Sequence, residues 1–346
     1  MEITSPAVST YFGWINTWLS NAFGVSPGTP VSLALSLLAY FIILSIILSV
    51  ASYLLGWIER KIIARSQSRR GPTYVGKFGI LQNFADLVKL ISKEWISPDR
   101  ADNPLFMMIL PVIVAAMIVL FTFLPFTSNF LGINTTLGLF VVFVAISFFP
   151  LLLFFAGWTS GNKFASISAQ RSVVLMVSYE IPLFLVIATV AMLAGGFGFP
   201  GIVGAQMNGW FALKMPIGFV IFFIVMLVEL ERPPFDLREA DSELVAGWLT
   251  DVSAPYYAVA LLLDYMRLFL GALLVTVVFL GGWLGPAPIP PFVWTMIKLA
   301  IVSFAIILVR VTVFRMRIDK VLRNGWVWMV PLALLNLLLT FIIFVR

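Results

Sequence analysis

The chain has 346 residues, of which 61% are hydrophobic and 11% are charged, whereas an average soluble domain has about 25% charged residues. It contains no cysteine and no histidine, which excludes disulfides, nucleophilic cysteines and the thiolate or imidazole ligands of zinc, haem and iron–sulfur sites. We therefore expect no metal site and no catalytic residue, and another subunit or a diffusible molecule must carry any redox chemistry.

Long apolar runs recur along the chain and predict transmembrane helices. The expected fold class is all-α, a polytopic membrane protein with one transmembrane bundle over residues 1–346. An aromatic-rich segment at 11–23 predicts a short interfacial helix before the first span. Eight spans are expected, at 31–58, 105–125, 135–158, 171–194, 216–231, 254–281, 292–313 and 326–345.

The basic residues predict the orientation of the bundle. Eighteen of the 22 Lys and Arg fall on the side that holds the loop after the first span, and two fall on the opposite side. The first side is therefore the cytoplasmic or matrix side, both termini of an eight-span chain lie on the outer side, and the large loops are cytoplasmic. Topology thus explains the net charge of +6, and no nucleic-acid partner is needed.

The first cytoplasmic loop, 59–104, contains an amphipathic segment. Its stretch "ILQNFADLVKLISKEW", residues 80–95, places apolar side chains at helical spacing, so we expect a helix with one apolar face. Such a helix can lie along the membrane surface, dock on a partner subunit, or be an ordinary solvated surface helix.

Ionisable residues inside spans are costly, so each is a hypothesis about function. Glu180 lies mid-span with no basic residue one turn away, and Pro182 is expected to bend the helix beside it. Asp264 and Arg267 have the i, i+3 spacing of an ion pair, which could be structural or functional. Lys298 is expected to extend its ammonium group towards the membrane surface.

The stretch "ELERPPFDLREADSELVAG", residues 229–247, contains six of the sixteen carboxylates and opens the acidic cytoplasmic loop 232–253. Pro233 and Pro234 end the fifth span. Asp236 and Glu239 have the spacing of a capping box, which predicts a helix with Asp236, Glu239 and Glu243 on one face. Repulsion within such a cluster would raise its carboxyl pKa values and favour proton entry. A solvated loop that balances the basic first loop is the alternative.

Four motifs occur in an order that is specific to one family. They are "ERK" at 59–61 with "RRGPTYVGKFGILQNFADLVKLISKE", then "GWTSGNKFASISAQRSVVLMVSYEIPL", "ERPPFDLREADSELVAG" and "RVTVFRMRIDKVLRNGW". Over about residues 30–345 the chain resembles the H-type membrane subunit of respiratory complex I, called subunit 1 in mitochondria. Relatives occur in archaeal quinone- or phenazine-reducing complexes and in membrane-bound hydrogenases.

The resemblance implies a non-redox subunit that walls a quinone chamber, binds no cofactor alone, and docks soluble iron–sulfur subunits beside antiporter-like and small membrane subunits in the lipid bilayer. The resemblance and the positions of the acidic residues assign a proton path to Glu180, Glu229, Glu231, Asp236, Glu239, Asp241, Glu243 and Asp264. The quinone chamber or subunit interface is assigned to Arg60, Lys61, Arg65, Arg70, Phe84, Asp86, Lys89, Glu94, Arg232 and Phe235.

The chain departs from the family pattern at several positions: Thr73, Lys77, Glu231, Asp264 and Phe314 replace the usual Asn, Pro, Asn, Glu and Pro. These departures suggest an archaeal or otherwise divergent complex that uses another lipophilic acceptor. The expected location is the cell membrane of a prokaryote rather than the mitochondrial inner membrane. The expected activity is that of a donor:quinone oxidoreductase complex that translocates protons. One alternative is the equivalent subunit of a hydrogenase or ferredoxin-linked complex without bound quinone. A stand-alone secondary transporter is the other, and the lack of an internal repeat weakens it.

Overall fold

A computed structural model describes residues 30–127, 133–238 and 241–345 of the chain. Within these ranges seven helices are long and apolar enough to cross a membrane. The expectation of an all-α polytopic membrane protein is confirmed. The predicted interfacial helix at 11–23 and residue Glu239 lie outside the described residues.

The helices differ widely in length, and short turns link several of them. In chain order they are α2 (Pro30–Ser66), α3 (Gln82–Ile91), α4 (Asn103–Phe121), α5 (Gly138–Thr159), α6 (Lys163–Ala194), α7 (Phe199–Gly204), α8 (Phe211–Lys214), α9 (Pro216–Glu229), α10 (Asp241–Leu244), α11 (Ala254–Phe279), α12 (Pro291–Thr312), α13 (Ile318–Arg323) and α14 (Val330–Thr340). Two π-helical segments, Asn324–Met329 and Phe341–Val345, continue α13 and α14.

Each predicted span coincides with a helix of the described chain. Seven of the eight have the length of a membrane span. The fifth, α9, has only 14 residues, which corresponds to about 21 Å of helix against a hydrocarbon core of about 30 Å. The count of eight spans and the outer position of both termini therefore stay predictions.

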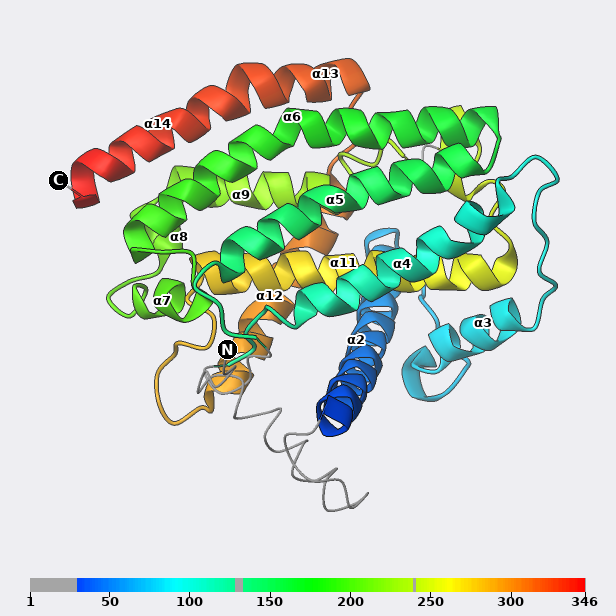
Figure 1. The fold of residues 1–346 in the computed structure, drawn as a ribbon, viewed down its shortest axis with the longest axis horizontal. Coiled ribbons are helices and arrows are strands. Elements are labelled where there is room, and N and C mark those ends of the chain that lie inside the picture. Colours follow the sequence, from blue (N-terminus) through cyan, green and yellow to red (C-terminus); the bar gives the residue numbers. More distant parts are fainter. Residues whose placement is uncertain (1–29, 128–132, 239–240, 346) are drawn as a thin grey trace.

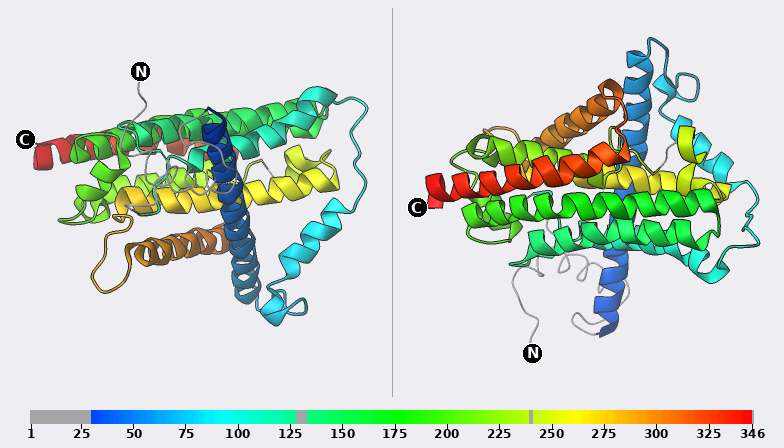
Figure 2. Two further views of the ribbon diagram at one scale, coloured as in Figure 1. Left: turned by 60° about the horizontal axis from the view of Figure 1, so that its bottom comes forward. Right: turned by 90° about the horizontal axis from the view of Figure 1, so that it is seen from above.

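The bundle is built around α11. Helices α4, α5, α6 and α14 run side by side, whereas α2 crosses them at a steep angle (Figures 1 and 2). In α11, 72% of the apolar window is buried within the chain, compared with 22% in α2. Helix α11 contacts α2, α4, α9 and α12, so it lies at the centre of the bundle.

Helix α6 carries polar residues at its N-terminal end. Its first turn is capped by Asn162, whose side chain accepts a hydrogen bond from the Phe164 amide at 3.0 Å. It ends at Gly195, which has a φ of 72° that glycine adopts without strain. Pro182 lies inside this helix and is buried.

The connection from α2 to α4 folds back onto α2. The side chains of Tyr53, Trp57 and Asn83 bond backbone carbonyls across it, with the Trp57 Nε1 to Phe78 O distance at 3.2 Å and the Asn83 Nδ2 to Tyr53 O distance at 2.9 Å. The predicted amphipathic helix over 80–95 is present as the shorter α3, and its apolar side chains are largely exposed in this chain.

Helix α3 begins after a tight turn that requires glycine. Gly79 has a φ of 72°, and a Cβ atom there would lie 2.2 Å from the Pro72 carbonyl oxygen. The turn therefore brings the "RRGP" segment against the start of α3.

The acidic loop does not form the predicted helix at Asp236. Its backbone is irregular from Arg232 to Arg238, and the described helix α10 begins only at Asp241. The Ser168 hydroxyl donates to the Arg238 carbonyl at 2.7 Å. A Cβ on Gly247 would come within 2.0 Å of the same oxygen. These contacts hold the segment against α6 and override the local capping pattern.

Candidate functional site

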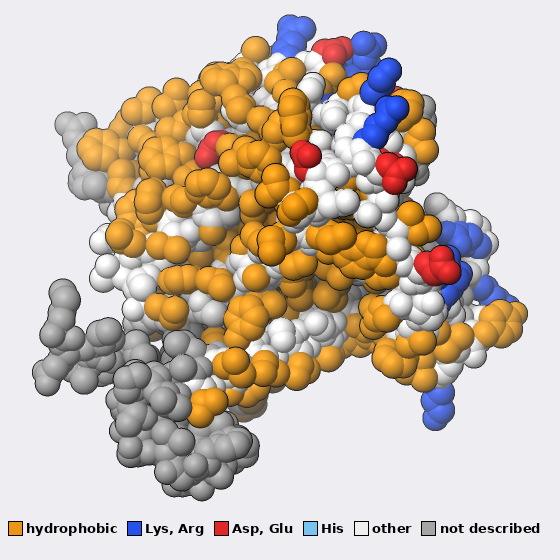
Figure 3. All heavy atoms as spheres, turned by 45° about the vertical axis from the view of Figure 1, so that its right-hand side comes forward, with side chains coloured by type: hydrophobic (Ala, Val, Ile, Leu, Met, Phe, Trp, Pro, Cys, Tyr) orange, Lys and Arg blue, Asp and Glu red, His pale blue; other side chains and the backbone are white. Residues whose placement is uncertain are grey.

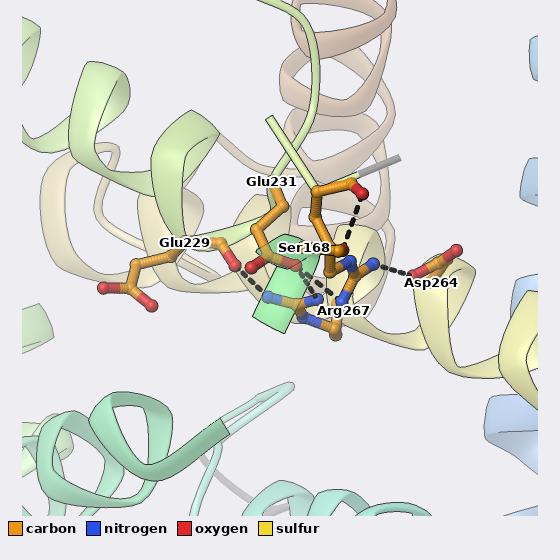
Figure 4. A network of polar contacts seen from close by, with 6 residues as sticks. Ser168, Glu229, Glu231, Asp264 and Arg267 are labelled. Atoms are coloured by element: carbon orange, nitrogen blue, oxygen red, sulfur yellow. Dashed lines mark hydrogen bonds and ion pairs between the residues drawn. The ribbon is translucent and has the colours of Figure 1, made fainter. Parts of the chain in front are cut away.

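Glu231 is the centre of a buried charge network. Its carboxylate lies 2.6 Å from Arg238 Nη1 and 3.2 Å from Arg267 Nη1, and all three side chains are almost fully buried (Figure 4). Arg238 also lies 3.5 Å from Asp264, and its guanidinium stacks over the Trp248 ring at 5.0 Å. Among the described residues, the carboxylates of Glu231 and Asp264 thus alternate with the guanidinium groups of Arg238 and Arg267.

The network corrects the expected pairing of Asp264 with Arg267. Both residues are on α11, but Asp264 pairs with Arg238, whereas Arg267 pairs with Glu231 and donates to the Glu229 backbone carbonyl. Helix α11 is therefore linked twice to the segment that follows α9.

Glu229 differs from the other carboxylates of the network. Its side chain points away from the arginines (Figure 4). It is 7% exposed, and its Oε2 atom has no hydrogen-bond partner among the described residues. Glu180 on α6 is half-buried and near enough for its carboxylate to repel that of Glu229. Glu229 and Glu180, two residues of the predicted proton path, are therefore close to each other.

A second buried carboxylate, Glu59 on α2, lies between two arginines. Arg232, which follows α9, and Arg310 on α12 both donate to its Oε1 atom. Arg232 also lies 5.4 Å from the centre of the Tyr265 ring on α11. This cluster joins α2, α11, α12 and the acidic loop.

Glu243 lies at the exposed edge of the acidic loop. Its carboxylate is 2.6 Å from Arg171 and 3.8 Å from Arg315. The hydrogen bond from Arg171 holds the pKa of Glu243 below its ordinary value, with further attraction from Arg315 and Arg317. The expected rise of the pKa by like-charge repulsion is therefore wrong for this residue. Asp236 is half-buried, and α10 begins at Asp241.

An apolar cavity of about 540 Å³ opens between α2, α3 and α11. Two of its polar lining residues, Arg60 and Asp86, form an ion pair at 2.5 Å, and Gln82, which lies outside this cavity, donates to the other Asp86 oxygen at 3.0 Å. Partial burial alone would raise the pKa of Asp86, but these bonds lower it below its ordinary value. The lining comprises Ser49, Val50, Ser52, Tyr53, Leu54, Arg60, Ile80, Leu81, Asn83, Phe84, Asp86, Leu87, Leu90, Ala258, Leu261, Leu262 and Tyr265.

A second, basic cleft of about 920 Å³ lies beside the first cavity and shares Arg60 with it. Arg69 and Arg70 line this cleft, together with the backbone turn from Gly71 to Tyr74. More widely, lysine and arginine side chains gather towards one end of an otherwise largely apolar face (Figure 3).

The structure brings together only part of the predicted chamber. Arg60, Phe84 and Asp86 line the apolar cavity, Arg70 lines the basic cleft, and Arg232 lies behind Tyr265. The remaining residues of that group lie elsewhere. Arg65, Lys89 and Glu94 are exposed, Lys61 lies over the Trp57 ring, and Phe235 is buried against Tyr179.

Sequence reasoning missed two basic partners of the carboxylates and one buried acid. Arg238 and Arg310 form ion pairs with carboxylates, and Glu59 is 1% exposed. Arg267 was expected to form an ion pair, but with Asp264 and not with Glu231. The signal available for Glu59 was its place at the end of an apolar helix, since a carboxylate buried there requires a cationic partner.

The fold and the site define a polytopic membrane protein in which a buried chain of paired charges lies next to an apolar cavity. The chain belongs to the NADH dehydrogenase family, whose model matches residues 38–341. The resemblance stated from the motifs is thereby confirmed, and the chain is a membrane subunit of the complex I type.

Several bacterial relatives, all named as H-type subunits of NADH-quinone oxidoreductase, cover most of the chain. The relative from Dehalococcoides mccartyi (strain CBDB1) is 38% identical over 88% of this chain and 86% of its own length. A relative from Syntrophobacter fumaroxidans is 39% identical over 86% of this chain and 92% of its own length. The relative from a Geobacillus species (strain WCH70) is 41% identical over 82% of this chain and 87% of its own length.

Proposed function

We propose that this chain is a non-redox subunit of a proton-translocating donor:quinone oxidoreductase in a prokaryotic cell membrane. It is not catalytic alone. The relatives' names favour a quinone acceptor over the hydrogenase alternative and leave the stand-alone transporter without support. The loop 59–104 would contact soluble iron–sulfur subunits, and antiporter-like and small membrane subunits would cover other faces of the bundle.

The observation that carries the proposal is the apolar cavity between α2, α3 and α11. Its aliphatic and aromatic lining suits an isoprenoid chain, while Arg60, Asp86 and Tyr265 offer hydrogen bonds to a polar head. Such a quinone would bind at the interface with partner subunits, since this chain leaves α3 largely exposed. The quinone would supply the redox chemistry.

The charge network supports the coupling half of the proposal. Tyr265 lines the cavity and contacts Arg232, and the preceding residue, Asp264, pairs with Arg238. Arg238 in turn pairs with Glu231, and Glu231 pairs with Arg267. Arg267 also donates a hydrogen bond to the backbone carbonyl of Glu229. Glu229 and the adjacent Glu180 are the groups proposed to exchange protons, because neither is held in an ion pair in the described structure. A change of charge at the cavity would displace the paired arginines, and this displacement would change the electrostatic environment of Glu229 and Glu180.

The cavity is tested by photolabelling the assembled complex with an azido-ubiquinone. We expect label on peptides 49–54, 80–90 and 258–265. Leu54→Trp should narrow the cavity opening and raise the KM for decylubiquinone several-fold. Ile46→Trp, at an aliphatic and somewhat more exposed position on α2 outside the cavity, should leave the KM unaltered. Label confined to other segments, together with an unchanged KM in Leu54→Trp, would contradict the proposed site.

The carboxylate path is tested with Glu180→Gln, which keeps the size of the side chain and removes its titration. The complex should assemble and bind quinone, while quinone-linked turnover and proton uptake in reconstituted vesicles should both fall severely. Wild-type rates for both would remove Glu180 from the path.

A further inference from the structure

Glu59 has an environment that neither the cavity nor the proton path accounts for. Glu59 lies near the end of α2 and is only 1% exposed. Arg232 and Arg310 both donate hydrogen bonds to its Oε1 atom. The three residues come from α2, the segment after α9, and α12, which are far apart in the sequence. One carboxylate therefore fastens three separate elements together.

The two arginines differ in how much the loss of their bond to Glu59 would cost. The Arg310 side chain is 36% exposed, so water can solvate it, whereas that of Arg232 is 10% exposed. A buried guanidinium without its carboxylate is strongly unfavourable. Arg232 therefore depends on Glu59 for its position much more than Arg310 does.

Arg232 also forms part of the support behind the cavity wall. Its guanidinium lies 5.4 Å from the centre of the Tyr265 ring, and Tyr265 lines the cavity. Helix α2 also approaches the same ring very closely, since a Cβ on Gly56 would lie 3.0 Å from Tyr265. The ring thus contacts both α2 and a guanidinium group that is itself bonded to Glu59 of α2.

The neighbour of Glu59 in the sequence faces the cavity directly. Arg60 lines it and pairs with Asp86 of α3. Two successive residues of α2 thus bind different elements: Arg60 pairs with Asp86 of α3, and Glu59 pairs with Arg232 at the start of the acidic loop. A displacement of α2 at this point would move both contacts together.

We infer that Glu59 is a positioning residue for the acceptor site, which acts by holding Arg232 against Tyr265 and so fixes the cavity wall relative to the acidic loop. The inference rests on the proposed function, because it concerns the same cavity. Without the Glu59 charge, Arg232 is drawn towards Asp264, the other carboxylate that attracts it, and the support behind Tyr265 is lost.

The test uses the assembled complex with Glu59→Gln, Arg232→Gln and the double variant, and Arg310→Gln as the matched control. The measurements are the yield of complex with its electron-input subunits, and KM and kcat for decylubiquinone. We expect the KM to rise about tenfold in Glu59→Gln, as when a binding group loses its orienting partner. Arg310→Gln should raise the KM much less than Arg232→Gln, because Arg310 does not contact Tyr265 in the described structure and its side chain is more exposed. Glu59→Asp should recover part of the loss.

The double variant separates positioning from a purely structural role. It removes the carboxylate together with the buried cation, so assembly should recover relative to Glu59→Gln, but the KM should stay as high as in Arg232→Gln alone. A wild-type KM in assembled Glu59→Gln, or a double variant whose loss is the product of the single losses, would overturn the inference. Failure of both Glu59→Gln and the double variant to assemble would also overturn it, by making Glu59 a structural residue only.

The outcomes distinguish this inference from the proposed function. Azido-ubiquinone label in the cavity together with a wild-type KM in Glu59→Gln rejects the role of Glu59 alone. Label confined to other segments, with Leu54→Trp unaffected, rejects the acceptor site itself, and the role of Glu59 fails with it.

Discussion

Several carboxylates near the acidic loop are paired with arginines that the local sequence does not reveal. Glu59, Glu231 and Glu243 each bind two arginines. Their partners lie between 7 and 251 positions away along the chain. Composition showed that the acids are concentrated, but pairing depends on which helices become neighbours. This is why repulsion was expected where the fold supplies attraction.

The Glu243–Arg171 pair gives a prediction about pH. Because the folded-state pKa of Glu243 lies below the ordinary value of 4.5, its contribution to docking of the acidic loop is fully present above that value. It is lost only as the pH falls through the lower, folded-state pKa. We expect amide protection of residues 243–249, corrected for intrinsic exchange, to stay constant from neutral pH down to about 5 and to fall only below the ordinary pKa.

The control for this experiment is Glu243→Gln. It should show weaker protection of the same amides at neutral pH and no acid-induced step. A loss of protection in the wild-type protein between neutral pH and about 5 would show that another group, with a higher pKa, controls the loop.

At the scale of elements, the structure shows how α11 ends. Lys298 of α12 was expected to reach the membrane surface, but it is 5% exposed and turns inwards. Its ammonium donates to the carbonyls of Leu280, Gly282 and Leu284 at 2.7, 3.0 and 2.6 Å. A cation is favourable at the carbonyl end of a helix. The expectation for Lys298 is therefore wrong, because the backbone after α11 offers three acceptors within hydrogen-bond distance of its ammonium group.

Replacing Lys298 by Met should destabilise this end of the bundle. The side chain keeps its approximate length, but one buried and two partly buried carbonyls lose their donor. A buried carbonyl that finds no other donor costs about 1–3 kcal/mol. The half-life of the detergent-solubilised complex on heating should shorten markedly. Lys214→Met is the control, because Lys214 is half-buried and makes one long bond of 3.4 Å, to Ala205. Equal half-lives for the two variants would contradict the role of Lys298.

The elements themselves were largely predictable, whereas the site was predictable only in part. Apolar length placed a helix at all eight expected spans, since membrane helices satisfy their own backbone groups. The capping pattern at Asp236 failed because Ser168 and Gly247 hold the Arg238 carbonyl in an irregular segment. Local patterns thus predict elements that are locally stabilised, and they miss segments whose conformation is set by contacts from other helices.

At the scale of the whole molecule, apolar surface and charge indicate which faces are covered by other components. Helix α2 and the last span bury only 22% and 17% of their apolar windows within the chain. On α3, Phe84, Val88 and Ile91 are each more than half exposed. Exposed apolar surface of this extent is typical of contact with lipid or with partner subunits. At the end of the molecule that holds α3, the arginines of the neighbouring loop would attract an acidic protein surface, which favours a partner subunit over lipid there.

The loop 59–104 therefore yields the last prediction. Arg65 and Arg70 are both exposed, and Arg70 lines the basic cleft beside α3. Reversing both to Glu changes the charge of the proposed docking surface by four units while disturbing no ion pair within the described part of this chain. We expect the soluble iron–sulfur subunits to dissociate during purification, while the membrane subunits stay together. Lys320→Glu with Arg323→Glu on α13, which are also exposed, makes the same change of charge elsewhere and should leave the complex intact. A complete complex with Arg65 and Arg70 reversed would show that the soluble subunits dock on another surface.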